Sequence, residues 1–273
     1  MIASALEHPN QVAERIIGRD YISWSAISTY QTCPLRFYFR YVQGLPEKTV
    51  SSSLVFGAAV HAAVQLHYEE LLAGAEPPDL ATLLASYHAE WKERNQQTIR
   101  FGQNESVDSL NRLAEKVLTA FRASDVAAGE GRTVAVEETL RGEIVPGVPD
   151  LLARIDLVTE SDDAVTVTDF KTSRSRWSVE QATINADQLL LYSELLQEIA
   201  PGKPLRLQFV VMTKTKQPAV EAIDVPYDPQ QVDRTRKVVE EVWSSIGAGR
   251  FWPNPSVTHC PTCPFRAECR AWV

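Results

Sequence analysis

Apolar residues recur at helical spacing through the first half of the chain, which predicts a mostly helical N-terminal region. Ser23 or Ser25 is a suitable N-cap for the first helix. Cys33 lies inside this helix, and Pro34 should break or restart it, because proline lacks the amide hydrogen that a helix interior needs. The predicted helices cover residues 25–42, 54–72, 80–95 and 107–127.

From residue 132 onward, apolar and polar positions alternate and β-branched residues are frequent, which predicts strands. The segment from Phe251 is rich in proline and cysteine and is expected to be irregular. This order predicts a mixed α/β core that follows a helical region and precedes a tail. Strands are expected at 132–144, 151–160, 164–172, 205–213 and 219–225, and helices at 179–199 and 228–249.

The composition is that of an ordinary globular protein, with 44% hydrophobic and 23% charged residues in a chain of 273. Its core can be large, so the cysteines are not needed as staples. The first twenty residues lack the apolar segment of a secretory signal, and the longest apolar stretch is too short for a bilayer. We therefore expect a cytoplasmic protein without a membrane partner, where clustered thiols more often bind metal than form disulfides.

The net charge of −8 argues against non-specific nucleic-acid binding by the surface as a whole. Basic residues are nevertheless grouped, and each group is either a solvated face or part of a phosphate-binding surface. Composition leaves both interpretations open. The groups are Arg36 with Arg40, Lys171 with Arg174 and Arg176, Lys214 with Lys216, and Arg266 with Arg270.

A predicted hairpin brings two acidic residues together. If residues 162–163 form the centre of its turn, Asp156 faces Asp169 across the two strands. Facing carboxylates repel unless a cation neutralises them, and Mg²⁺ and Mn²⁺ prefer such oxygen ligands. Lys171 emerges on the same face and can act on metal-bound water. The alternative is an ordinary pair of exposed acids with Lys171 and Arg154 as partners.

Two further pairs share a helix face at a spacing of four residues, Gly57 with His61 and Gln188 with Tyr192. Neither pair is specific by itself, and a core histidine is the ordinary interpretation of His61.

Four sequence segments, in order, resemble the RecB-like branch of the PD-(D/E)XK nucleases, which includes the nuclease domains of recombination helicase–nucleases and the Cas4 proteins. The segments are GAAVHAAV, ARIDLV, TDFKT and QLLLY, and SWSAISTYQTCPLRFYFRYVQGL resembles the opening of that family. The resemblance implies an α/β, restriction-endonuclease-like fold with a mixed sheet flanked by helices. It matches Gly57 and His61, Asp156, Asp169 with Lys171, and Gln188 with Tyr192 to the family motifs.

The resemblance implies hydrolysis of DNA phosphodiester bonds with Mg²⁺ or Mn²⁺. Asp156 and Asp169 would bind the ion, with the backbone carbonyl of Phe170 and a nitrogen of His61 as further ligands. Glu137 would contact these ligands without binding the ion itself. The preferred interpretation, however, is that Glu137 is an exposed strand residue.

The same family assigns roles to three more side chains. Lys171 would orient the attacking water, and Gln188 and Tyr192 would hold the substrate backbone or Lys171. Asp150 is a further acidic neighbour that is better explained as a turn residue.

The four cysteines follow the pattern of the iron–sulfur members of this family, in which one cysteine precedes the nuclease motifs and three follow them. The resemblance implies that Cys33, Cys260, Cys263 and Cys269 hold a [4Fe–4S] cluster, which would pin the tail against the N-terminal helix. Zinc is the chemical alternative. The implied organisation is an N-terminal extension over 1–22, a nuclease domain over 23–250 with a helical insertion near 75–130, and an iron–sulfur tail over 251–273.

The expected function is a metal-dependent exonuclease that acts on single-stranded DNA ends in repair or recombination. No phosphate-binding loop of a motor ATPase occurs in the sequence, so a separate helicase or processing complex is the expected partner. The alternatives are a Cas4-like nuclease that trims DNA for integration and a non-catalytic iron–sulfur subunit that binds DNA. Arg36, Arg40, Arg174 and Arg176 are the candidate DNA contacts, and the adjacent Phe37 and Tyr38 either stack on bases or lie in the core.

Overall fold

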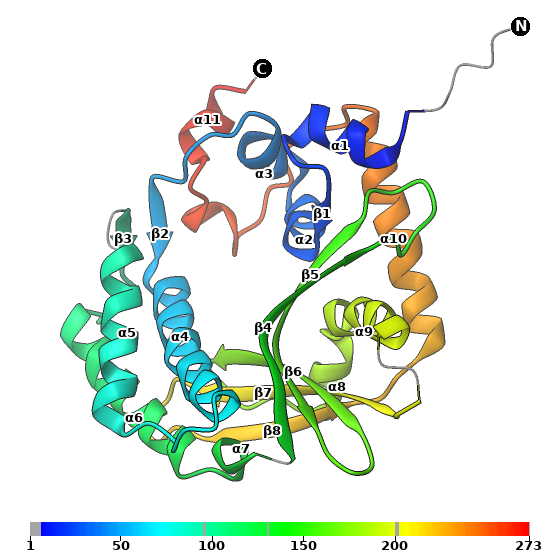
Figure 1. The fold of residues 1–273 in the computed structure, drawn as a ribbon. Helices are drawn as coiled ribbons and strands as arrows, with labels where there is room; N and C mark the ends of the chain where they lie inside the picture. The colour runs from blue at the N-terminus through cyan, green and yellow to red at the C-terminus, as the bar shows by residue number, and fades with distance from the viewer. Residues whose placement is uncertain (1–6, 95–96, 130, 200–201, 273) are drawn as a thin grey trace, which may run out of the picture. The chain divides into compact units, whose positions relative to one another are not determined.

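The computed structural model describes residues 7–94, 97–129, 131–199 and 202–272 (Figure 1). The chain divides into two compact units, each of which is described by itself. One contains Met1–Lys48, Thr139–Ala153 and Asp228–Val273, and the other contains Thr49–Glu138 and Arg154–Tyr227. No helix in the part of the chain that the structure describes is long and apolar enough to cross a membrane.

The unit that contains Thr49–Glu138 and Arg154–Tyr227 is built on a mixed sheet. Strand β6 (Val165–Ser173) lies between β5 (Leu151–Glu160), to which it is antiparallel, and β7 (Leu205–Thr213), to which it is parallel. Strand β8 (Val220–Val225) is antiparallel to β7, and β4 (Arg132–Gly142) pairs with β5. The predicted α/β architecture with a mixed sheet flanked by helices is confirmed.

The β5–β6 hairpin has the predicted register. Its ladder runs from Glu160↔Val165 to Leu157↔Thr168, and the amide of Ser161 donates to the carbonyl of Ala164 at 2.9 Å in the turn. Beyond Leu157, the carboxylate of Asp156 replaces a backbone acceptor. Its Oδ2 accepts a hydrogen bond from the amide of Phe170 at 2.8 Å, so the backbone ladder ends where the acidic residues begin.

Three helices of this unit, α4 (Ser52–Leu72), α5 (Leu80–Arg94) and α6 (Val107–Arg122), lie side by side and share one apolar core (Figure 1). Two short parallel strands, β2 (Thr49–Ser51) and β3 (Thr98–Arg100), accompany them. The predicted extension of α6 to residue 127 is wrong, because Ser124 turns back to bond the carbonyl of Phe121 at 2.6 Å. A separate short helix, α7, covers Asp125–Ala128.

The single helix predicted over 179–199 is also wrong. The structure has α8 (Val179–Ile184) and α9 (Asp187–Ile199), which are separated by Asn185 and Ala186. The side-chain amide of Asn185 donates to the carbonyl of Gln181 at 2.7 Å and so closes the first helix. Asparagine competes with the backbone for hydrogen bonds in this way, a local effect that apolar periodicity does not reveal.

The other unit contains elements from both ends of the chain. Ser23 caps α2 (Trp24–Thr32), and α3 (Pro34–Phe37) begins after the predicted break at Cys33, followed by the π-helical segment η1 (Tyr38–Val42). Strand β1 (Ile22–Ser23) pairs in parallel with the first residues of β5. The remaining helices are α1 (Pro9–Ile17), α10 (Pro229–Gly247), η2 (Cys260–Thr262) and α11 (Arg266–Arg270).

The sequence pattern predicts no element before Ser23 and an irregular tail, whereas the structure adds α1, β1, η2 and α11. Aromatic residues form the core around α2 and α3: Phe37 is fully buried and contacts Tyr30 and Phe251. Tyr30 donates to the carbonyl of Arg250 at 2.6 Å. Phe37 therefore belongs to the core, and its alternative role in stacking on bases is wrong.

Candidate active site

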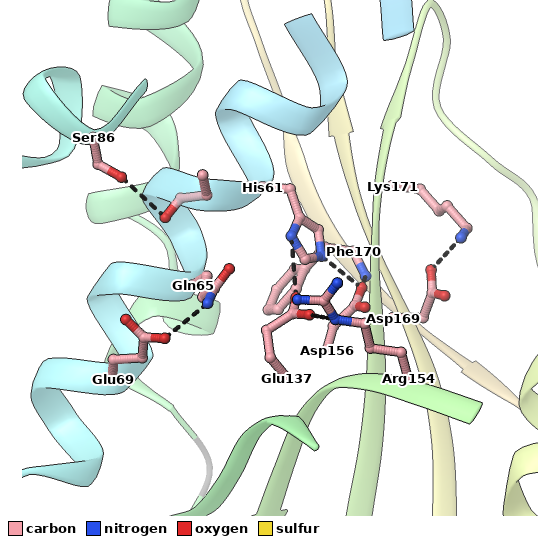
Figure 2. Close-up of polar contacts among 11 residues, drawn as sticks. His61, Gln65, Glu69, Ser86, Glu137, Arg154, Asp156, Asp169, Phe170 and Lys171 are labelled. Atoms are coloured by element: carbon pink, nitrogen blue, oxygen red, sulfur yellow. Dashed lines mark hydrogen bonds and ion pairs between the residues drawn. The ribbon is translucent and has the colours of Figure 1, made fainter. Parts of the chain in front are cut away.

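Three ligand-bearing side chains converge from three elements. His61 on α4, Glu137 on β4 and Asp156 on β5 each offer a ligand atom, and these atoms all lie within 4.8 Å of one another. Nε2 of His61 lies 2.9 Å from Oδ2 of Asp156, and its Nδ1 lies 3.4 Å from Oε1 of Glu137 (Figure 2). The edge of the imidazole faces the Phe170 ring, with the ring centroids 6.1 Å apart, which restricts its rotation.

The prediction that Glu137 is an exposed strand residue is wrong. Its side chain is only 10% exposed, and it contacts both His61 and Arg154. The backbone at Glu137 has φ of +53°, a left-handed conformation that is uncommon for a residue with a side chain. Such backbone strain persists only where the surroundings hold it, and here it accompanies a carboxylate aimed at the other two ligands.

The charges of this group are mutually dependent. Burial alone would lower the pKa of His61, but the hydrogen bond and charge of Asp156, with the charges of Glu137 and Asp169, raise it. Burial raises the pKa of Glu137, against the opposing effect of His61. The acidic neighbours of His61 therefore favour a protonated imidazole where no metal is bound.

Asp169 and Lys171 lie on the next strand, β6. Nζ of Lys171 lies 2.5 Å from Oδ2 of Asp169, and the Lys171 side chain is 36% exposed whereas the Asp169 side chain is 7% exposed. Burial raises the pKa of Asp169 to about 6, against the lowering effect of Lys171. Oδ2 of Asp169 is buried and forms an ion pair with the Lys171 ammonium group, and no other described group donates a hydrogen bond to it.

Gln188 and Tyr192 lie on α9. The Gln188 amide donates to the Tyr192 hydroxyl at 3.2 Å. Burial raises the pKa of Tyr192 to about 12, with the charges of Asp169 and Asp156 acting in the same direction. Tyr192 therefore lies within electrostatic reach of both acids and keeps its proton.

This arrangement can hold a divalent cation. One imidazole nitrogen and two carboxylates offer a mixed nitrogen–oxygen donor set that suits Mn²⁺ as well as Mg²⁺. The neighbouring carboxylate of Asp169 offers further oxygen atoms. The Phe170 amide contacts Asp156, and the role of the Phe170 carbonyl as a ligand stays a prediction.

The remaining acidic and basic candidates have other partners. Asp150 accepts hydrogen bonds from Asn10 and Arg141, each at 2.9 Å. Arg36 and Arg40 both lie within ion-pair distance of Glu47, at 3.9 Å and 3.4 Å. Arg176 pairs with Glu221 at 2.6 Å, whereas Arg174 is exposed.

The four cysteines are free thiols that border one cavity of about 240 Å³. Among the described residues, no three of their sulfur atoms lie within 4.8 Å of one another. Backbone amides face two of the sulfurs, Asn254 at 3.5 Å from Cys33 and Ser256 at 3.2 Å from Cys260. Burial and the neighbouring thiols raise the pKa values of Cys263 and Cys269.

Comparison with solved structures gives a protein from Eubacterium rectale that is provisionally described as an exonuclease, with a TM-score of 0.60 and 14% identity. The match covers 99% of this chain and 93% of that one, and it shows a shared fold. A second structure, of SSO0001, covers 91% of this chain and 96% of its own at 16% identity, but its TM-score of 0.36 is too low to carry an argument. No curated protein matches the sequence significantly.

The sequence also matches a protein-family model. The match runs from residue 21 to residue 270, and the model describes the PD-(D/E)XK nuclease superfamily. The matched span contains every residue of the site built above, from His61 to Tyr192. The chain belongs to the PD-(D/E)XK nuclease superfamily.

Proposed function

We propose that this protein is a divalent-metal-dependent deoxyribonuclease that hydrolyses phosphodiester bonds at the ends of single-stranded DNA. The observation that carries the proposal is the convergence of His61, Glu137 and Asp156, with their ligand atoms within 4.8 Å of one another. The adjacent strand adds Asp169 and Lys171, which supply a further carboxylate and a partly exposed ammonium group. Family membership supports nuclease chemistry, and the description of the Eubacterium rectale protein supports exonuclease action.

The residues present suit a bound Mg²⁺ or Mn²⁺. His61, Glu137 and Asp156 would hold the ion, together with the neighbouring carboxylate of Asp169. When bound, such a cation stabilises negative charge on the phosphate and makes water more acidic. The acidic neighbours of His61 favour its protonated form, so the imidazole would have to give up that proton to serve as a ligand.

The remaining side chains position the reactants. Lys171 presents hydrogen-bond donors next to Asp169, where they can orient a water molecule and stabilise the charge that develops on the phosphate oxygens. Tyr192 is 5% exposed and bonded to Gln188, so we assign this pair to holding the residues around Asp169 rather than to contacting the substrate. Gln188 and Tyr192 are therefore positioning residues in this scheme.

We also propose that the four cysteines hold a [4Fe–4S] cluster. All four thiols border one cavity, which brings together the four cysteine ligands that such a cluster requires. The backbone amides of Asn254 and Ser256, which face the sulfurs of Cys33 and Cys260, support this proposal. Hydrogen bonds to ligand sulfurs are a feature of iron–sulfur sites. A separate helicase or processing complex is the proposed partner, because the sequence contains no motor ATPase motif.

The test is hydrolysis of end-labelled oligonucleotides by the purified protein with Mn²⁺. We expect single-stranded DNA to be degraded from an end, and duplex DNA and single-stranded RNA of the same sequence to react more slowly. Asp169→Asn should lower the rate roughly a thousandfold or more, because it removes a charge from the group that stabilises the transition state. The matched control is Asp163→Asn, in the exposed turn of the same hairpin.

Each other result has a defined meaning. DNA binding without cleavage by the unaltered protein would contradict the enzyme and favour a non-catalytic subunit. Cleavage that survives Asp169→Asn would contradict the assigned site. A visible absorption band with roughly four irons per chain supports the cluster, and stoichiometric zinc contradicts it.

A further inference from the structure

One face of α4 leads away from the candidate metal ligands. Ser53, Gly57 and His61 follow one another at intervals of four residues, so they lie along one side of the helix. All are partly accessible to solvent. At 1.5 Å per residue, Ser53 lies about 12 Å along the helix axis from His61.

Gly57 fixes this face against β6. A Cβ at this position would approach Oγ1 of Thr172 to 3.1 Å, so the glycine permits close contact between helix and strand. Ser53 and His61, which flank Gly57 on α4, are therefore held in register with the strand that carries Asp169 and Lys171.

Lys214, just past the end of β7, is fixed beside Ser53. Its ammonium group donates to the Ser53 hydroxyl at 2.6 Å and lies 5.8 Å from the centre of the Phe56 ring. Its backbone amide donates to the carbonyl of Ser173 at 2.6 Å, which ties the loop to the end of β6. A long cationic side chain held at both ends in this way is already ordered for binding.

Arg174 adds a second positive charge nearby. The carbonyl of Ser173, the residue before Arg174, accepts the Lys214 amide at 2.6 Å, so the two cations lie on adjoining segments. Burial and the charge of Arg174 lower the pKa of Lys214. The charge of Glu105 opposes this shift, and its carboxylate accepts hydrogen bonds from Ser52 and Gly102, at 2.5 Å and 2.9 Å.

Neither cation is neutralised by direct contact. Among the residues that the structure describes, no carboxylate forms an ion pair with Lys214 or Arg174. Lys171, Arg154 and Arg176, in contrast, each contact one. Two neighbouring cations without a direct counter-ion lower their mutual repulsion when an anion binds between them.

We propose that Lys214 and Arg174 bind a backbone phosphate of the DNA strand, roughly two to four nucleotides from the bond that is cleaved. The proposal rests on the nuclease function above and extends it to the path of the substrate. The distance follows from about 12 Å along α4 and about 3.4 Å per stacked nucleotide, with fewer nucleotides if the strand is extended. Such a contact positions any sequence equally, because all phosphates are alike.

The first test measures binding of fluorescent single-stranded DNA in Ca²⁺ at several salt concentrations. Lys214→Gln should weaken binding about five- to tenfold and reduce the slope of log K against log salt by about 0.7, the value for one lost phosphate contact. The matched control is Lys203→Gln, which removes the same charge before the opposite end of β7 and should leave the slope unchanged. Lys214→Arg should retain binding, which separates loss of charge from misfolding.

The second test uses oligonucleotides with one uncharged methylphosphonate at each position in turn. In the unaltered protein, one position two to four nucleotides from the cleaved bond should weaken binding, and in Lys214→Gln that same position should have no further effect. If every methylphosphonate weakened binding by Lys214→Gln as much as it weakens binding by the unaltered protein, the inference would be overturned. A salt slope in Lys214→Gln equal to that of the unaltered protein would also overturn it. Failure of the unaltered protein to cleave would instead contradict the nuclease proposal, and the binding data would still judge Lys214.

Discussion

The nuclease site and the cysteine-lined cavity both offer ligands to metal, but they are organised in opposite ways. His61, Glu137 and Asp156 bring nitrogen and oxygen atoms within 4.8 Å of one another, whereas among the described residues no three cysteine sulfurs are that close. Ligands of one Mg²⁺ ion lie about 2.1 Å from it and hence no more than about 4.2 Å apart. The spacing of His61, Glu137 and Asp156 is close to the one that a single ion requires, whereas the four thiols share the border of one cavity.

The two regions also differ in how they exist without metal. The acids of the nuclease site have internal cations beside them, since His61, Arg154 and Lys171 each contact a carboxylate. The thiols have less need of such partners, because burial raises the pKa values of Cys263 and Cys269 and keeps them neutral. The comparison teaches that either group would have to lose protons to bind a metal ion, His61 in the nuclease site and the thiols in the cavity, while the acids already have charged partners.

Loss of one cysteine should have the largest effect and test the thiol half of this comparison. Cys33→Ser replaces a soft sulfur ligand that lies far from the other three in sequence. We expect iron content to fall to near zero and the midpoint of thermal unfolding to fall by roughly 10 °C, because metal binding stabilises the folded state. Iron analysis and calorimetry measure both.

The control for this experiment is Asp156→Asn, which should keep the iron while it abolishes hydrolysis. Unchanged iron and unfolding midpoint in Cys33→Ser would contradict the role assigned to the cysteines.

Asp169→Asn tests whether the buried charge of Asp169 lowers the free energy of unfolding. Burial raises the pKa of Asp169 to about 6, above the value near 3.9 of an unfolded chain. The folded state therefore keeps a proton that the unfolded state has lost, and this contribution to stability is full below about pH 4 and lost as the pH rises through about 6.

At pH 8 without divalent metal, Asp169→Asn should thus be more stable than the unaltered protein by about 2 kcal/mol. The difference should shrink as the pH falls toward 4. Urea unfolding in a chelator at several pH values measures it, and a less stable variant at pH 8 would refute the assignment.

Gly57→Ala tests the close contact between helix and strand and should have the smallest effect. The added methyl group meets Oγ1 of Thr172 at 3.1 Å, so the Thr172 side chain must give by a few tenths of an ångström or α4, with His61, moves instead. We expect about a tenfold loss of hydrolysis with unchanged iron content. Thr172→Ala removes the obstructing oxygen, so the double variant should recover most of the activity. A double variant no better than Gly57→Ala would show that the glycine serves another purpose.

Much of the nuclease region was predictable from the sequence, because its signals are local. The alternating pattern and the Asp-Asp turn predict the hairpin and its register, which places Asp156 and Asp169 near one another. Apolar periodicity predicts α4 and α5 to within two residues at each end. Pro34 predicts the break after Cys33.

The features that were missed depend on contacts between distant segments or on side chains that compete with the backbone. Glu137 looked like an exposed strand residue, since its left-handed backbone and its contacts with His61 and Arg154 leave no trace in the alternation. Asn185 interrupts a strongly helical pattern with one side-chain hydrogen bond. The short strands β1, β2 and β3 are stabilised by their partners rather than by their own sequences.

The β5–β6 hairpin carries its exposed turn at one end and the acidic residues of the candidate site at the other. Backbone pairs from Leu157↔Thr168 to Glu160↔Val165 lie between the acidic residues and the exposed turn at Asp162 and Asp163. At about 3.3 Å per residue, that turn is roughly 20 Å from Asp156 along the strand, and the paired strands connect the two rigidly. A fluorophore or affinity tag inserted there would follow the catalytic strands closely without obstructing a substrate, which makes this tip the natural handle for single-molecule work.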